Sequence, residues 1–198
     1  MVDVLITGVI VAAAIVLAEV AARRWRLSEF AARKTLHLAA ALAVAAGTVV
    51  ADYRAYLWTG LIFTAVMVGS RWLPLATLAA MRQTSLGEVF FPVGVALSSL
   101  IAPNLTGFVA ASLVLGLADT AAALAGRHWA SPRLLWSKTL AGSGAFLLVA
   151  GVLLLVIAPR PPVLAIVAAS TLAEALSPKG SDNLTVPVVV ALGFALLG

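Results

Sequence analysis

Residues able to bind phosphate gather in the stretch "GRHWASPRLLWSKTLAGS". Lys138 supplies a mobile positive charge, and Arg127 supplies a planar, forked one. Thr139, Gly142 and Ser143 open the apolar run that follows, where N–H groups at a helix N-terminus would point at an anion. No GxxxxGK[ST] sequence occurs in the chain, which disfavours a P-loop ATPase without excluding phosphate binding. Taken alone, the stretch also suits an ordinary basic loop with a helix cap.

One carboxylate lies on a helix face that otherwise carries small residues. Ser112, Gly116, Asp119, Ala123 and Gly126 are spaced four, three, four and three residues apart, which places them on one face. Close packing against another helix would explain the glycines, but it does not explain the aspartate. A small face lets a phosphate or a metal ion approach the backbone, and the carboxylate would hold the metal.

Two more polar groups occur where apolar segments begin. The sequence "RKTLH" places Arg33, Lys34 and His37 within one helical turn. A neutral histidine there could orient a hydroxyl or a phosphate, although a purely structural histidine is the more common case. Glu88 opens the segment "GEVFFPVG", where a favourable interaction with the helix dipole would explain it without a function.

The stretch "AEALSPKGSDNLTVP" interrupts two apolar segments with charged and amide side chains. A turn-rich loop would explain its serines and glycine. It does not explain Glu174 inside the apolar segment, followed by Asp182 and Asn183 where the next segment starts. Ionisable residues at membrane depth are costly, so each of these needs a partner or a task.

The elements that position these residues are strongly apolar. The chain is 63% hydrophobic and 11% charged, whereas a soluble domain carries about 25% charged residues. We predict eight apolar segments, at about 3–22, 34–51, 55–71, 88–102, 106–126, 139–158, 161–177 and 184–198. Helices are the structures that can span lipid singly. We therefore expect an all-α, polytopic transmembrane bundle of seven or eight helices, the last of which, with Pro187 inside it, could be re-entrant.

The distribution of basic residues predicts the orientation. Alternate loops hold Arg23, Arg24, Arg26, Arg33, Lys34, Arg71, Arg82, Arg127, Arg133, Lys138 and Lys179, and the others hold only Arg54 and Arg160. The positive-inside rule places the first set in the cytosol and both termini outside. It also explains the net charge of +5 without nucleic acid. The acidic start and the basic residues after the first segment predict a retained helix instead of a secretory signal. The chain has no cysteine, which excludes disulfides and thiolate chemistry.

Five motifs occur in the order "RKTLH", "GEVFFPVG", "LADTAAALAGR", "SKTLAGS" and "AEALSPKGSDNLTVP". Together they resemble the membrane-integral, CTP-dependent lipid kinase family, which includes phytol kinase, dolichol kinase and CTP-dependent diacylglycerol kinase. The family-like core covers residues 33–190 of a single integral membrane domain, 1–198. The family's nucleotide region corresponds to Asp119, Gly126, Lys138, Thr139, Gly142 and Ser143, and its C-terminal signature to Glu174, Asp182, Asn183 and Pro187.

The resemblance implies transfer of the γ-phosphate of CTP to a polyprenol, a phytol-like alcohol or another lipid alcohol, with Mg²⁺ or another divalent cation. We assign the metal to Asp119 and Asp182. The nucleotide-binding set also includes Arg33, Lys34, Arg127 and Asn183, and Glu88 and Glu174 would support the substrate. Either Asp182 or His37 would take the proton of the alcohol.

One position departs from the family pattern. Members usually carry a glutamate just before the glycine of the KTxEG-like motif, where this chain has Ala141. If that glutamate helps to hold metal or nucleotide, another acid must substitute, and Glu88 and Glu174 are the candidates.

Two other functions fit parts of the sequence. Similar motifs occur in CDP-diacylglycerol synthases, so a CTP-dependent lipid cytidylyltransferase is the enzymatic alternative. A small transporter coupled to protons or cations would use Asp119 and Glu174 as ion sites. A transporter predicts coupling residues near the membrane midplane, whereas most of the acids here fall on one predicted side. The sequence does not name the alcohol or the oligomeric state.

Overall fold

The computed structural model describes residues 1–70 and 86–197, and within these ranges the chain is helical, without a β-strand. The helices are α1 (Val2–Arg24), α2 (Glu29–Gly47), α3 (Tyr56–Ser70), α5 (Gly87–Ile101), α6 (Leu105–Leu113), α7 (Asp119–His128), α8 (Leu140–Ile157), α9 (Val163–Leu176) and α10 (Asp182–Leu197). A 3₁₀ turn, η1 (Tyr53–Ala55), precedes α3. A π-helix, η2 (Val114–Ala118), joins α6 and α7 into one continuous helix.

These helices confirm the predicted all-α fold. Counting α6, η2 and α7 as one, the described ranges contain eight helical segments, one for each predicted apolar segment. Helix α10 continues through Pro187. The predicted loop residues Arg71 and Arg82 lie outside the described residues.

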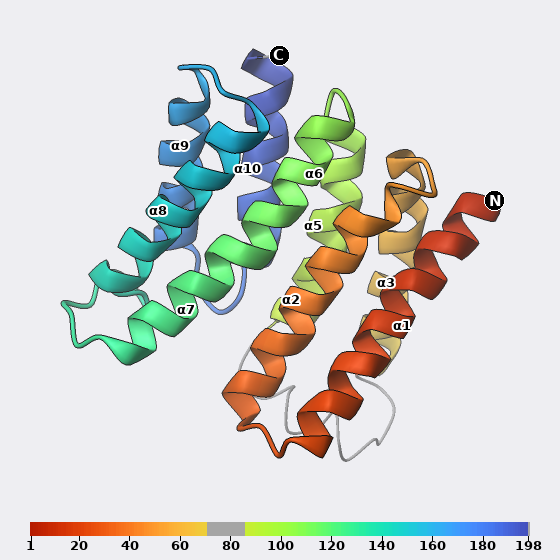
Figure 1. Ribbon diagram of the computed structural model, residues 1–198, viewed down its shortest axis with the longest axis horizontal. Coiled ribbons are helices and arrows are strands. Elements are labelled where there is room, and N and C mark those ends of the chain that lie inside the picture. Colours follow the sequence, from red (N-terminus) through yellow and green to blue (C-terminus); the bar gives the residue numbers. More distant parts are fainter. Residues whose placement is uncertain (71–85, 198) are drawn as a thin grey trace.

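The helices run up and down in succession, so both termini lie at the same end of the molecule (Figure 1). Helices α1, α2 and α3 form one group, and α6 to α10 form the other. Helix α5 packs against both α3 and α10 and so joins the two groups. The loops after α1, α7 and α9 lie toward the end opposite the termini (Figure 1). This alternation brings the predicted polar motifs toward one end.

Side-chain caps fix where several helices begin. Ser28, Asn104 and Thr139 each accept a hydrogen bond from a backbone N–H in the first turn of α2, α6 and α8. An N-cap of this kind satisfies a donor that the helix leaves unpaired. The caps therefore fix the first residues of α2, which carries Arg33 and His37, and of α8.

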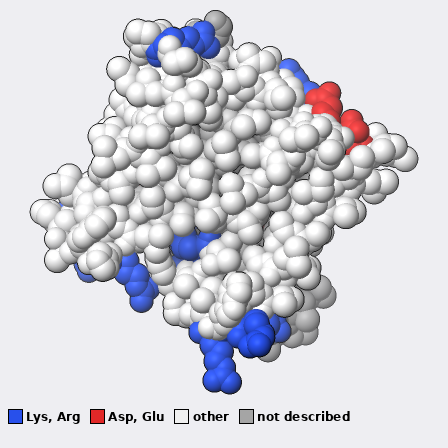
Figure 2. All heavy atoms as spheres, viewed as in Figure 1, with Lys and Arg blue, Asp and Glu red and all other residues white. Residues whose placement is uncertain are grey.

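The molecule is apolar on its outside as well as in its core. Phe108, Phe146 and Phe194 are buried, while Leu148 and Val156 on α8 are 70% and 77% exposed. Figure 2 shows a surface largely without charged atoms across its middle, with most basic atoms in its lower half. Within the described ranges, α1, the continuous α6–α7 helix and α8 are long and apolar enough to cross a membrane, and α5, α9 and α10 are shorter apolar helices.

Candidate active site

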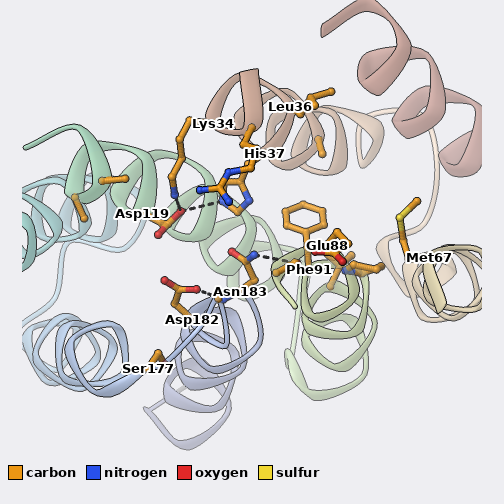
Figure 3. A pocket seen from close by; sticks show the side chains of 18 of the residues that line it. Lys34, Leu36, His37, Met67, Glu88, Phe91, Asp119, Ser177, Asp182 and Asn183 are labelled. Atoms are coloured by element: carbon orange, nitrogen blue, oxygen red, sulfur yellow. Dashed lines mark hydrogen bonds and ion pairs between the residues drawn. The ribbon is translucent and has the colours of Figure 1, made fainter. Parts of the chain in front are cut away.

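A cavity of about 870 Å³ lies where the two helix groups meet α5. Its polar part is lined by every residue that the sequence predicted for the site except Ser143, namely Arg33, Lys34, His37, Glu88, Asp119, Gly126, Arg127, Lys138, Thr139, Gly142, Glu174, Asp182 and Asn183. Figure 3 shows side chains from α2, α5, α7 and α10 converging on this space. Residues that are far apart in the chain therefore form one polar end.

Lys34, His37 and Asp119 form the Asp119 cluster, which links α2 to α7. Lys34 Nζ donates to Asp119 Oδ2 at 2.6 Å, and the Asp119 side chain is 4% exposed. His37 Nε2 lies 3.3 Å from Asp119 Oδ2 and 3.1 Å from the carbonyl oxygen of Leu115. Both neighbours are acceptors, so Nε2 carries a proton, and Nδ1 is the atom of a neutral His37 that can accept one.

The π-helix η2 ends directly before Asp119 and sets the position of this cluster. Its Leu115 carbonyl faces His37 across the α2 interface. A Cβ on Gly116 would lie 2.5 Å from the Cβ of Ala41, so the glycine allows α2 to approach η2 closely. Wide turns of this kind recur at functional sites. The predicted small face thus divides, because Gly116 serves helix packing while Asp119 and Gly126 line the cavity.

Lys138, Ser143, Glu174 and Asp182 form the Lys138 cluster, which joins the α7–α8 loop to α8, α9 and α10. Lys138 Nζ donates to Glu174 Oε1 and to Asp182 Oδ2, both at 2.6 Å. Ser143 Oγ donates to the other oxygen of Glu174 at 2.8 Å. Burial disfavours the charged ammonium, but the carboxylates of Asp182 and Glu174 outweigh it and raise the pKa of Lys138 above its ordinary value.

The start of α8 corrects one expectation from the sequence. Its first backbone N–H groups were predicted to receive an anion, but the protein already pairs them. The N–H of Leu140 donates to the Pro132 carbonyl at 3.0 Å, and that of Ala141 to Ser131 Oγ at 3.1 Å. The N–H of Gly142 donates to Thr139 Oγ1 at 3.1 Å. A phosphate at this end of the cavity would therefore be held mainly by side chains.

The N-terminal turn of α8 also packs closely against α7. A Cβ added to Gly126 would lie 2.7 Å from Thr139 Oγ1. One added to Gly142 would lie 2.9 Å from the Ala122 carbonyl oxygen. The two glycines therefore bring the α7–α8 loop, with Lys138, against the face that carries Asp119.

The remaining predicted residues approach from α2, α5, α7 and α10. Asn183 Nδ2 donates to the Gly87 carbonyl at 3.0 Å and so ties α10 to α5, where Glu88 follows. Arg127 lies over the ring of Phe30, 4.6 Å from its centre. Arg33 lines the cavity from α2. These contacts place charged groups on three sides of the polar end.

Sequence reasoning missed some cavity residues. Lys179 and Gly180 line the polar end and have positive φ angles of 47° and 85°. The turn sequence "SPKGSD" was a usable signal for this conformation. Phe91 packs edge-on against His37 with ring centres 5.2 Å apart. An aromatic residue inside an apolar segment gives no such signal.

A second hollow of about 550 Å³ adjoins the first at the surface. The two spaces share Gly126, Arg127, Ser137 and Thr139. The outer hollow adds Arg133, Trp129 and Trp136 from the α7–α8 loop, and is lined by these and neighbouring loop residues. The two spaces are therefore neighbours that share part of one wall.

The polar end holds two carboxylates with a predicted metal role, Asp119 and Asp182, and each of them pairs with a lysine. Among the described residues, no group of three or more histidine, aspartate or glutamate side chains is placed to hold a metal. Mg²⁺ is usually bound through only one or two protein carboxylates together with substrate phosphates and waters. Asp119 and Asp182, both on the cavity wall, fit that smaller share.

No family model, curated protein or solved structure matches the chain.

Proposed function

We propose that this protein is an integral membrane kinase that transfers the γ-phosphate of CTP to a lipid alcohol at the cytosolic face. The observation that carries the proposal is a single cavity with a charged end and an apolar end. The charged end suits a nucleotide phosphate, and the apolar end suits a hydrocarbon tail. The choice of CTP and of this reaction follows from the motif resemblance.

The proposed orientation places the helices across the bilayer with both termini outside. Both termini lie at one end of the molecule, and the loops after α1, α7 and α9 lie toward the other (Figure 1). Those loops and the helix ends that flank them carry nine of the eleven basic residues of the described chain, as the cytoplasmic side of a membrane protein does. The outward apolar side chains of α8 would then contact lipid.

In this proposal the triphosphate binds at the polar end through Arg33, Arg127 and Lys138. Side chains supply the contacts, because the N–H groups that start α8 are already paired. The base and ribose extend into the outer hollow beside Trp129 and Trp136, where a planar base can stack on an indole ring.

Phosphoryl transfer requires mainly positioning and neutralisation of charge. Asp119 and Asp182 would hold Mg²⁺, which neutralises phosphate charge when it is bound. The alcohol oxygen forms a bond to the γ-phosphorus while the bond to the β–γ bridging oxygen breaks, so CDP leaves. The proton of the alcohol passes to Asp182 or to Nδ1 of His37.

The resembling family usually has a glutamate where this chain has Ala141. Glu174 is a better candidate than Glu88 to take the place of that glutamate. The Glu174 side chain is buried and contacts both Lys138 and Ser143, the residue that follows Gly142. Glu88 approaches the cavity from α5, on the other side.

The test supplies purified protein with CTP labelled at the α- or the γ-phosphate, with a panel of lipid alcohols and separately with phosphatidic acid, and separates the products by thin-layer chromatography. A lipid monophosphate carrying only the γ-label is expected. The Asp119→Asn variant should lose this product while still inserting, and Asp52→Asn, at the exposed start of η1, should keep it. A lipid labelled only from the α-phosphate would instead indicate a cytidylyltransferase. No labelled lipid, with proton flux in liposomes, would indicate transport.

A further inference from the structure

The cavity lining ends in buried residues on the side away from the ionic clusters. These are Tyr56 and Thr59 at the start of α3, Val11 of α1 and Val44 of α2. Tyr56 is fully buried and stacks on Phe108 with ring centres 5.3 Å apart. These residues are the floor of the cavity.

The hydroxyl groups of the floor are hydrogen-bonded within the protein, so they do not require a polar group on a ligand. Thr59 Oγ1 lies 2.6 Å from Thr7 Oγ1, and both threonines are buried. Thr59 Oγ1 also donates to the carbonyl oxygen of Ala55 at 3.2 Å. The Tyr56 hydroxyl donates to the Ala43 carbonyl at 3.4 Å. Because the protein pairs these hydroxyls, hydrocarbon can end against the floor without leaving a buried polar group unpaired.

The four helices that line this part give a consistent depth. On α2 the part of the lining nearest to the floor runs from His37 to Val44, and on α5 it runs from Glu88 to Val95. At a rise of about 1.5 Å per residue, each of these stretches spans about 10 Å. On α3 the lining from Met67 to Tyr56 spans about 16 Å by the same rise.

On α1 the lining runs from Arg23 to Val11, and Glu19 is the charged residue nearest to the floor. The stretch from Glu19 to Val11 spans about 12 Å at the helical rise. The four stretches therefore span about 10 to 16 Å, which matches a hydrocarbon with roughly 8 to 13 carbons in its main chain, or two to three isoprene units with about 10 to 15 carbons including their methyl groups.

We propose that this space binds one hydrocarbon tail and that its floor limits the tail to about 10 to 15 carbons. The inference rests on the proposed function, and it names the acceptor as a single-chain alcohol of two or three isoprene units or an alkyl chain of equal length. The whole cavity, polar end included, measures about 870 Å³. Pockets for one small ligand measure about 300 to 1,000 Å³, so a diacylglycerol or a long polyprenol does not fit inside together with phosphates.

The test measures kcat/KM for prenyl alcohols of increasing length and for a diacylglycerol, in mixed micelles at fixed mole fraction. We expect a maximum at two or three isoprene units and a fall of at least about tenfold at four units, because an added group that the pocket cannot hold costs that much. Equal kcat/KM from two units up to a long polyprenol, or a preference for diacylglycerol, would overturn the tail limit and leave the kinase proposal intact.

Two variants change the depth of the apolar part in opposite directions. Ala40 lines the apolar part and is 5% exposed, so Ala40→Leu should shift the optimum to a shorter tail. Ala46→Leu, exposed on the same helix, is its control. Val11→Ala should shift the optimum to a longer tail, with Val9→Ala at an exposed position of α1 as control. An optimum that stays fixed in both cavity variants contradicts the assignment, even if one of them proves unstable.

Binding of a tritiated three-unit prenyl alcohol separates this proposal from the kinase reaction. Competition by unlabelled alcohols should show the same length limit without any nucleotide. If the limit appears in binding but no phosphate is transferred, the tail pocket stands and the proposed kinase function is wrong. If binding shows no length dependence, the tail pocket is wrong.

Discussion

The two ionic clusters of the cavity differ in how their buried charges are balanced. The Asp119 cluster pairs one lysine with one carboxylate and a histidine between two helices. The Lys138 cluster pairs one lysine with two carboxylates, Glu174 and Asp182, from two further helices. Counted at formal charges, with histidine neutral, the first is balanced and the second carries one surplus negative charge.

The two clusters differ in how strongly the stability of each depends on its lysine. Lys34 is 21% exposed and Lys138 15%, so Lys34 has more access to solvent. Lys138 also neutralises two buried carboxylates that would otherwise repel each other. In the proposed reaction, the surplus carboxylate of the Lys138 cluster would hold the cation that accompanies the phosphate.

The largest expected effect comes from removing the lysine of the Lys138 cluster. Lys138→Met leaves two buried carboxylates without a cation, and breaking a buried pair in this way costs about 3–5 kcal/mol. Thermal unfolding in detergent should show this loss, and phosphate transfer should disappear. Arg160→Met, in the loop between α8 and α9, should leave both unchanged.

A combined variant sharpens that result. Adding Glu174→Gln and Asp182→Asn to Lys138→Met removes the unpaired charges, so stability should recover while transfer stays absent. If the triple variant is as unstable as Lys138→Met alone, the cost is not electrostatic.

The corresponding change in the balanced cluster should cost less stability. Asp119→Asn leaves a single lysine, which can turn toward solvent, so we expect a loss of about 1–3 kcal/mol. Phosphate transfer should fall at least about 100-fold, because the carboxylate supports charge in the transition state. A stability loss equal to that of Lys138→Met would erase the difference between the clusters.

Asp182→Asn makes the Lys138 cluster resemble the balanced one. Lys138 keeps Glu174 as a partner, so unfolding should change by less than about 1 kcal/mol. The Mg²⁺ concentration for half-maximal activity should rise at least about tenfold. Glu19→Gln, on the cavity wall outside both clusters, is the control and should keep the original Mg²⁺ requirement.

Removing either of two helix caps should have a smaller effect on stability, and the effect should be of similar size for both. Thr139 caps α8 at the site, and Asn104 caps α6 in the loop that follows α5, away from the site loops. Replacing either by alanine should cost about 1 kcal/mol of stability. Only Thr139→Ala should also raise KM for CTP, because Thr139 lines the cavity. A similar change in KM for Asn104→Ala would show that the kinetic effect is global.

The smallest expected effect is that of pH on the Lys138 cluster. Asp182 and Glu174 raise the pKa of Lys138 above 10.5. Its contribution to stability is therefore complete below pH 10.5 and is lost only as pH rises through the raised value. The difference in unfolding between wild type and Lys138→Met should therefore not shrink as pH rises from about 6 to 9. A difference that shrinks as pH rises within that range would contradict the assigned pairing.

The apolar segments of the sequence predict the helices. The basic loops predict that the polar residues gather at one end of the molecule. Apolar runs must become helices, and loops that hold basic residues alternate along the chain, so both features follow from local composition. Residue types also identified Asp119, Lys138, Glu174 and Asp182 as charges in need of partners.

The identity of those partners depends on how the helices pack in three dimensions. Lys34 and Asp119 are 85 residues apart in the chain, and nothing in either local sequence specifies the other. In the structure, hydrogen bonds within the protein also pair the backbone N–H groups of Leu140, Ala141 and Gly142 at the start of α8. The floor at Tyr56 and Thr59 likewise appears only once α1, α2 and α3 meet. Helix formation depends on neighbours in the chain, whereas ion pairing and cavity depth depend on how whole helices pack.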